Sequence, residues 1–175
     1  MKPLREVAES YMALADAQRQ LRHGACEEAA ANCRKAMEVS RTIPAEEAFD
    51  HIGFDAFCHA GLAEALGRMG VFDESLISAE RALHYFNRRG ELNQDDGKLW
   101  IAAVFSRALA LDGLERGAEA LAEFRKASEM IAERKGDLPG REEFLSTASD
   151  SITRLERSVK PGKPAGYKAW WEFWS

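Results

Sequence analysis

The chain has 175 residues, of which 46% are hydrophobic and 30% are charged, and this composition fits one compact domain with a proper core. The formal net charge is −5, and no basic block exceeds the pair Arg88–Arg89, which excludes nucleic acid as an expected partner because phosphate binding needs a concentrated basic face. No run approaches the roughly 18 apolar residues of a membrane span, and charged residues such as Arg5 and Glu9 interrupt the start where a signal peptide would be apolar. We therefore expect a cytoplasmic protein that does not depend on a membrane.

Helical periodicity runs through the chain, and glycine or proline interrupts it at intervals that suit helix ends. Strong helix formers, mainly alanine, leucine, glutamate and arginine, fill the segments between. Pro3 and Pro44 suit first helical turns, and Asp95 or Asp96 can cap the fifth helix. The predicted helices are, in chain order, 3–22, 26–41, 45–69, 73–88, 96–114, 117–135 and 141–158.

Small residues recur along the chain in sets of three with a constant internal spacing. In each set the second residue follows the first by 12 positions, and the third follows the second by 7. The second set lies 46 positions after the first, and the third lies 45 positions after the second. The sets are Ala17, Ala29 and Ala36; Ala63, Ser75 and Ala82; and Ala108, Ala120 and Ala127. Antiparallel helices pack closely only where small side chains meet, so the spacing predicts three successive helical hairpins.

The middle unit, residues 59–83, resembles a tetratricopeptide (TPR) repeat. It contains the pair Leu62–Ala63, a turn glycine at Gly70, an aromatic residue at Phe72 and the terminal pair Ala82–Leu83. The flanking units match more loosely, and the period of 45–46 exceeds the family's usual spacing of about 34 residues. Longer helices account for the difference, as in kinesin-light-chain-like TPRs. Residues 1–158 also resemble a small group of uncharacterised bacterial TPR-like proteins.

The resemblance implies an all-α fold, a right-handed α-solenoid of three long TPR-like helical hairpins followed by a capping helix. The TPR-like domain then spans 1–158, and a Pro/Gly linker with an aromatic tail spans 159–175. A capping helix is expected because the last hairpin would otherwise leave an apolar face open. The expected parts of the domain are repeats at about 3–43, 45–89 and 95–135 and the capping helix at 141–158.

In TPR proteins the first helix of each hairpin lines a concave groove that binds partner peptides. The resemblance therefore implies a non-catalytic protein-interaction module or scaffold that binds a peptide or partner helix on the concave face of its repeats. The groove positions carried over to this chain are Tyr11, Leu14, Gln18, Arg22, Phe57, Ala60, Glu64, Arg68, Ala102, Phe105, Leu109 and Asp112. The apolar members of this set are equally compatible with a place in the core. The Lys/Asn clamp that some TPR proteins use for a terminal carboxylate has no match.

An alternative function is suggested by His51, Asp55 and His59, which are spaced four residues apart and share one face of the third predicted helix. Imidazole and carboxylate groups at this spacing can hold a divalent metal, with His84 or Glu80 as a fourth ligand, in a metal-binding protein or metal-dependent enzyme. The absence of a recognised ligand motif favours the other interpretation, in which they are polar residues at a seam between helices, hydrogen-bonded to neighbours or water. No recognised ligand or catalytic motif is present, so we expect neither an enzyme nor a cofactor.

Three cysteines, Cys26, Cys33 and Cys58, form a sparse and odd set that suits reduced thiols. Cys26 and Cys33 are seven residues apart on one predicted helix, about 10 Å along its axis, which is too far for a disulfide. We expect them to be small core residues.

The tail places Tyr167, Trp170, Trp171 and Trp174 on one face of a short helix. An exposed aromatic stripe of this kind needs a surface to cover it. Three dockings remain open: on the protein's own body, in the groove of a second copy, or at a membrane interface. Docking on a second copy would make a homodimer, and a structural homo-oligomer joined by the tail is a further alternative function.

Overall fold

The computed structural model describes residues 4–89 and 94–159, and within these ranges the chain forms seven α-helices and no strand. The tail residues Tyr167, Trp170, Trp171 and Trp174 lie outside the described residues, so their docking stays a prediction. The helices are α1 Leu4–Arg22, α2 Cys26–Ser40, α3 His51–Arg68, α4 Phe72–Arg89, α5 Gln94–Gly113, α6 Gly117–Glu133 and α7 Arg141–Ser158.

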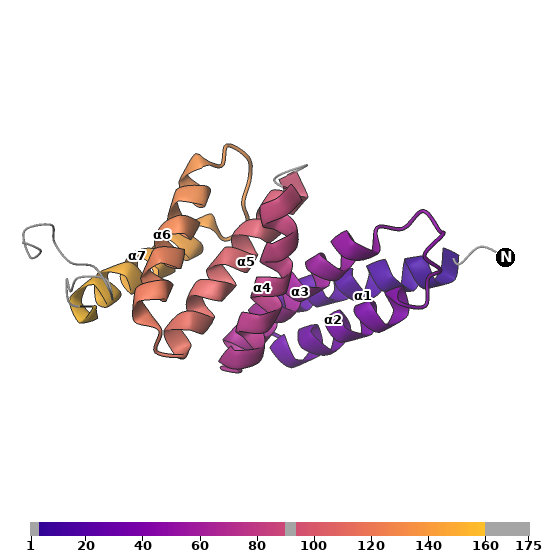
Figure 1. Ribbon diagram of the computed structural model, residues 1–175, viewed down its shortest axis with the longest axis horizontal. Helices are drawn as coiled ribbons and strands as arrows, with labels where there is room; N and C mark the ends of the chain where they lie inside the picture. Colours follow the sequence, from indigo (N-terminus) through magenta and orange to yellow (C-terminus); the bar gives the residue numbers. More distant parts are fainter. Residues whose placement is uncertain (1–3, 90–93, 160–175) are drawn as a thin grey trace, which may run out of the picture.

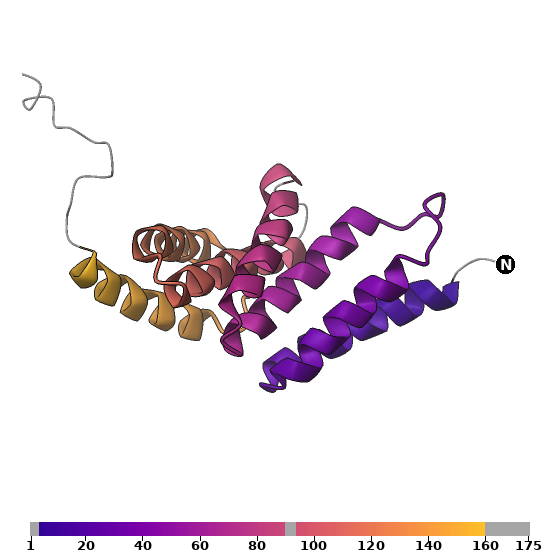
Figure 2. The same cartoon turned by 60° about the horizontal axis from the view of Figure 1, so that its bottom comes forward.

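The helices stack in sequence order along the long axis of the molecule, from the α1–α2 hairpin at one end to α7 at the other (Figures 1 and 2). Each helix packs mainly against its neighbours in the chain, and α3 also packs against α5. This arrangement confirms the prediction of an all-α solenoid.

The small residues that recur in the sequence are fully buried in the stack of helices. All nine of them are 0% exposed, including Ala17, Ala63 and Ala108 on the first helices of the three hairpins. Ser75 also joins two helices by a hydrogen bond. Its buried Oγ donates to the carbonyl oxygen of Ala63 at 2.7 Å and so links α4 to α3. The spacing therefore identified the positions that hold each hairpin together.

The turn inside each hairpin repeats one backbone geometry at positions 24, 70 and 115. Gly24 and Gly70 have φ values of +75° and +77°, and Glu115 has a φ of +60° at the equivalent place. In each turn the next residue donates a backbone hydrogen bond of 2.9 Å across the helix end, as Arg116 does to Leu111. This pattern is the left-handed helix stop that normally uses glycine, and the third hairpin uses glutamate in its place.

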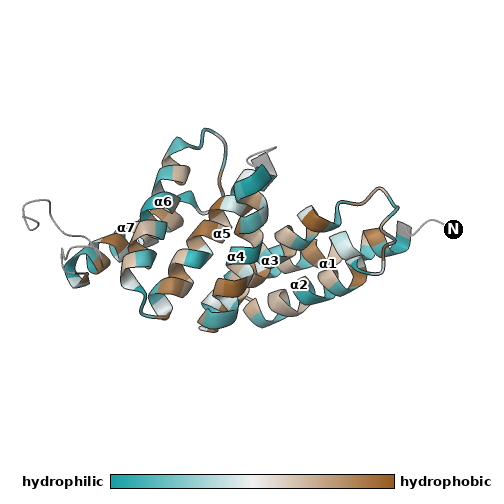
Figure 3. Cartoon of the chain, in the orientation of Figure 1, coloured by the Kyte–Doolittle hydropathy of each residue, from teal (hydrophilic) through white to brown (hydrophobic). Residues whose placement is uncertain are grey.

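The core consists of two main clusters of buried apolar side chains that share α3. One cluster joins α1 and α2 to one part of α3, and the other joins the rest of α3 to α4, α5, α6 and α7. Phe57 packs against both clusters. Figure 3 shows the resulting alternation of hydrophobic and hydrophilic residues along the helices.

The third helix begins later than predicted, at His51 and not at residue 45. Asp50 is its N-cap, since its side chain accepts a hydrogen bond from the backbone N–H of Gly53 at 3.0 Å. Pro44 instead lies in a turn, where its carbonyl oxygen accepts from the N–H of Glu47, and residues 41–50 form a loop. The prediction that Asp95 or Asp96 caps the fifth helix was also wrong, because α5 already begins at Gln94.

Candidate functional site

We call the side of α1, α3 and α5 that carries the predicted groove residues the inner face. Its members differ in how far they reach solvent. Tyr11, Arg22 and Arg68 are exposed. The partly exposed members are Gln18, Phe57, Glu64, Ala102, Leu109 and Asp112, and the buried members are Leu14, Ala60 and Phe105.

Ala60 is 1% exposed and belongs to the core. The same is true of two larger apolar members of the set. Leu14 is 6% exposed and lies in the cluster of α1, α2 and α3. Phe105 is 7% exposed, and its ring makes edge contacts with Phe124 at 5.8 Å and with Phe144 at 4.9 Å between ring centroids. Phe144 comes from α7, so the last helix covers this position. Both side chains therefore stabilise the fold and offer little surface to a partner.

Tyr11 and Phe57 are the aromatic side chains that remain accessible on the inner face. Tyr11 is 51% exposed, and the rest of its ring is held by edge contacts with Phe49 and Phe54 at 5.9 and 5.2 Å. Phe57 stacks on the buried ring of Phe86 at 6.1 Å. Phe57 is held between the two core clusters and only partly exposed, whereas Tyr11 is held on one side and open to solvent on the other. Rings held in place in this way lose little conformational freedom on binding, as interface anchors require.

A charged pair on α3 links this helix to the end of α1. Arg68 donates one hydrogen bond to a carboxylate oxygen of Glu64 at 2.6 Å and another to the carbonyl oxygen of Leu21 at 2.7 Å. Burial raises the pKa of Glu64 above its usual range, Arg68 opposes this rise, and Glu143 of α7 adds to it. The inner face thus holds the Glu64 carboxylate in an environment that disfavours its negative charge.

A second surface lies where the sequence suggested a metal site. We call it the α2–α4 hollow, a depression of about 730 Å³ between the end of α2, the first turns of α3 and the middle of α4. Its lining residues are Ser40, Arg41, His51, Ile52, Asp55, Ala56, His59, Ile77, Glu80, Arg81, His84 and Tyr85. On α3, its residues lie on the opposite side of the helix from Phe57, Glu64 and Arg68, since each residue turns the helix by about 100°.

The three residues of the predicted metal alternative are not arranged as ligands. His51 has both ring nitrogens beside backbone carbonyl oxygens, Nδ1 at 3.0 Å from Phe49 and Nε2 at 2.9 Å from Ile43, so the ring fastens the 41–50 loop to α3. Asp55 pairs with Nε2 of His59 at 3.3 Å, and this hydrogen bond is the main cause of a lowered pKa at Asp55. Within the described part of the chain, no group of three or more His, Cys, Asp or Glu side chains is placed to hold a metal.

Sequence reasoning placed His84 or Glu80 of α4 beside this site as a fourth ligand, but it missed the contribution of α2 and of Ile77 and Arg81 on α4. Ile77 and Arg81 lie on α4, which is the second helix of its hairpin, and groove positions were sought only on first helices. The available signal was an isoleucine at position 77 on the helix face that otherwise carries Glu74, Arg81 and His84, and the structure leaves its side chain 52% exposed.

The cysteines are free thiols, as expected from the sequence, and two of them are buried between α2 and α3. Burial raises the pKa of Cys33 to about 12 and raises that of Cys58 as well. Thiols with raised pKa values are poor nucleophiles at neutral pH, so Cys33 and Cys58 fill space in the core.

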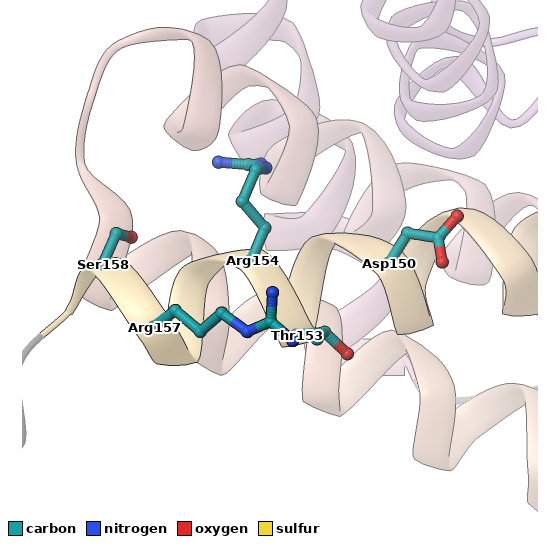
Figure 4. Close-up of a pocket in the computed structure, with 5 residues that line it drawn as sticks. All are labelled: Asp150, Thr153, Arg154, Arg157 and Ser158. Carbon is teal, nitrogen blue, oxygen red and sulfur yellow. The ribbon is translucent and has the colours of Figure 1, made fainter.

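A shallow depression on α7 makes a weaker site. Its lining residues, Asp150, Thr153, Arg154, Arg157 and Ser158, all come from one helix (Figure 4). Arg154 points toward the neighbouring helices and pairs with Asp112 of α5. Asp112, one of the predicted groove residues, is therefore engaged in an ion pair within the protein. A surface built by a single helix, with one of its two arginines already paired, offers few converging groups to a ligand.

None of the helices in the described ranges has the length and apolar character that crossing a bilayer requires. A comparison with curated proteins finds no match. The profile of the family described as Domain of Unknown Function (DUF3856) matches residues 2–144. The chain is also similar to the crystal structure of a TPR-like protein from Chlorobium tepidum TLS, with 69% sequence identity and a TM-score of 0.86 over 89% of this chain and 99% of that chain. These matches confirm the TPR-like resemblance, and the chain belongs to the DUF3856 domain family.

Proposed function

We propose that this protein is a non-catalytic interaction scaffold that binds a peptide or partner helix on the inner face of α1, α3 and α5. One observation carries the proposal. α3 is buried along most of its length, yet it leaves Phe57, Glu64 and Arg68 accessible along one side. Aromatic and arginine side chains are the types that dominate binding energy at protein interfaces.

The TPR-like fold supports this proposal, because proteins of this fold generally act as interaction scaffolds. The charges on the inner face also indicate which charge a partner should carry. Burial is the main cause of the raised pKa of Glu64, Arg68 opposes this rise, and Glu143 adds a smaller contribution to it. A lysine or arginine of the partner beside Glu64 would stabilise its negative charge. We therefore expect inner-face ligands to carry a basic residue beside their apolar anchors.

The test is selection of peptides on the purified full chain from a phage-displayed random library, followed by calorimetric titration of the selected peptides. The double variant Tyr11→Ala/Arg22→Ala removes two exposed side chains of the inner face and should weaken binding at least about tenfold, which corresponds to 1.4 kcal/mol. The matched control is Met12→Ala/Arg157→Ala, which removes a large exposed side chain and an exposed arginine outside the inner face and should leave the affinity unchanged.

A selection that enriches no binding peptide would contradict the proposal, as would peptides that bind the inner-face variant as well as the natural chain. Light scattering of the full chain and of a truncation ending at Val159 shows whether a second copy is the partner. A dimer that becomes a monomer on truncation would assign the groove to the tail of another copy.

A further inference from the structure

We propose that α7 is an intramolecular ligand of the inner face, which covers the α5 part of that face until a partner helix displaces it. The inference rests on the proposed function in one respect, since α7 would regulate the binding of a partner to the inner face. The displacement itself involves residues of this chain and can be measured without an external partner. Three features carry it: the contacts of α7 with inner-face residues, the shallow burial of α7, and the tether at its start.

The side chains of α7 contact inner-face residues at two points on α5. The ring of Phe144 lies against that of Phe105, with 4.9 Å between the ring centroids, and Arg154 pairs with Asp112. Phe105 and Asp112 are seven residues apart, about two helical turns, so they share one side of α5. The two contacts follow the same order along both helices, so α7 lies alongside this side of α5 and runs in the same direction.

These contacts divide the inner face into an open part and a covered part. On α1 and α3, Tyr11 is 51% exposed and Arg68 is also exposed. On α5, Phe105 is 7% exposed, and the side chain of Asp112 is 24% exposed and already paired. A partner that lies along the whole inner face therefore meets α7 where it would contact α5.

The helix that covers α5 is itself held by few buried side chains. Of the 18 residues of α7, Ala148 and Leu155 are buried, whereas α4, which has the same length, buries eight. Phe144 and Ile152 are only partly buried. The arginine side chain that pairs with Asp112 is 55% exposed, and an ion pair as exposed as this contributes little to stability. Because stabilisation scales with the apolar area buried, α7 costs less to release than a helix buried like α4.

The start of α7 is fixed by contacts outside the inner face. Arg141 donates hydrogen bonds of 2.9 Å to the carbonyl oxygens of Ile131, Arg134 and Gly136. The helix therefore stays beside α5 when its inner-face contacts break. A tethered ligand has a high effective concentration, so it excludes weak partners and yields to strong ones.

The contacts of α7 also indicate the kind of partner that displaces it. α7 presents α5 with an aromatic ring and, ten residues later, with a guanidinium group, about 15 Å apart along the helix. A partner helix with the same pair of side chains takes over both contacts. It improves on α7 at one position, because Glu143 makes a small contribution to the raised pKa of Glu64. We expect a neutral or basic residue at that position of the partner.

The experiment uses the full chain and a synthetic, fluorescently labelled peptide with the sequence of α7, residues 141–158. In the natural chain α7 occupies the site, so fluorescence anisotropy should show weak binding of the peptide. Arg154→Glu in the chain breaks the pair with Asp112 and should tighten binding at least about tenfold, because apparent affinity rises with the fraction of chains whose site is open. Phe144→Ala should act in the same direction. The matched control is Arg157→Glu, at an exposed arginine on the same helix, which should leave binding unchanged.

Two further measurements locate the effect. A peptide that carries both Phe144→Ala and Arg154→Glu lacks the two side chains that contact α5, and it should bind no form of the chain. Hydrogen exchange with mass spectrometry of the Arg154→Glu chain should show acceleration in residues 141–158 while α5 stays protected.

Three results would overturn the inference. These are equal binding of the α7 peptide to the natural chain and to the Arg154→Glu chain, an equal gain from the Arg157→Glu control, and exchange that accelerates in α5 as much as in α7. The last result would make α7 a structural part of the core. Failure of the proposed function gives a different pattern, in which no library peptide binds either form of the chain while the α7 peptide still binds the Arg154→Glu chain.

Discussion

At the scale of single residues, Glu64 shows how the inner face retains a charge that the fold disfavours. Its carboxylate is partly buried, paired with Arg68 and repelled by Glu143. Because its pKa is raised in the folded protein, the folded state binds a proton more readily than the unfolded chain does. Between the ordinary pKa of glutamate and the raised value, stability contributed by this group therefore falls as the pH rises.

We predict that Glu64→Gln increases the free energy of unfolding modestly at pH 7, because the amide keeps the shape and the hydrogen bond without the charge. The increase should shrink as the pH falls through the raised pKa of Glu64, where the natural side chain also becomes neutral. Urea unfolding followed by circular dichroism at several pH values measures this. The control is Glu38→Gln, the same substitution at an exposed glutamate on α2. A destabilised Glu64→Gln variant at pH 7 would contradict the raised pKa.

At the scale of helices and turns, the sequence predicted the features that depend on regular spacing of residues along a helix. The nine small residues were found because close packing demands small side chains at fixed intervals along each helix. The start of α3 was missed because two signals competed, Pro44 and Asp50, and the loop 41–50 is stabilised by His51 from the following helix. The exposure of groove residues was only partly predictable, since Phe105 is covered by Phe144 from a distant part of the chain.

The third hairpin turn offers a direct test at this scale. Glu115 occupies the left-handed conformation in which the equivalent turns have Gly24 and Gly70. Glu115→Gly should therefore stabilise the protein by about 1 kcal/mol, because the relief of backbone strain outweighs the greater freedom of glycine in the unfolded chain. The reverse change in an equivalent turn, Gly70→Ala, should destabilise by a similar amount. Thermal or urea unfolding measures both, and a destabilised Glu115→Gly variant would show that the glutamate side chain compensates for its backbone.

At the scale of the whole molecule, two apolar clusters are connected through α3. Contacts between neighbouring helices dominate, so stability is expected to be distributed along the stack and not concentrated in one core. The α1–α2 hairpin depends on the first cluster alone, while α5, α6 and α7 depend on the second.

We predict that core substitutions act locally along the stack. Leu14→Ala in the first cluster should cost about 2–5 kcal/mol and should accelerate amide hydrogen exchange mainly in α1 and α2. Leu155→Ala in the second cluster should accelerate exchange mainly in α6 and α7. Hydrogen exchange with mass spectrometry of peptide fragments separates the two patterns. Equal acceleration along the whole chain in both variants would show that the protein unfolds as a single cooperative unit.

The position of α3 between two open surfaces has a thermodynamic consequence. Phe57, Glu64 and Arg68 stand on one side of this helix, and Ile52, Asp55 and His59 stand on the other. If ligands bind on both sides of α3, one that shifts or stiffens this helix changes the free energy of binding of the other. Linkage then requires that each ligand alter the affinity of the other by the same factor. A helix held from two sides is therefore a means of making two binding events cooperative or mutually exclusive, without any hinge between domains.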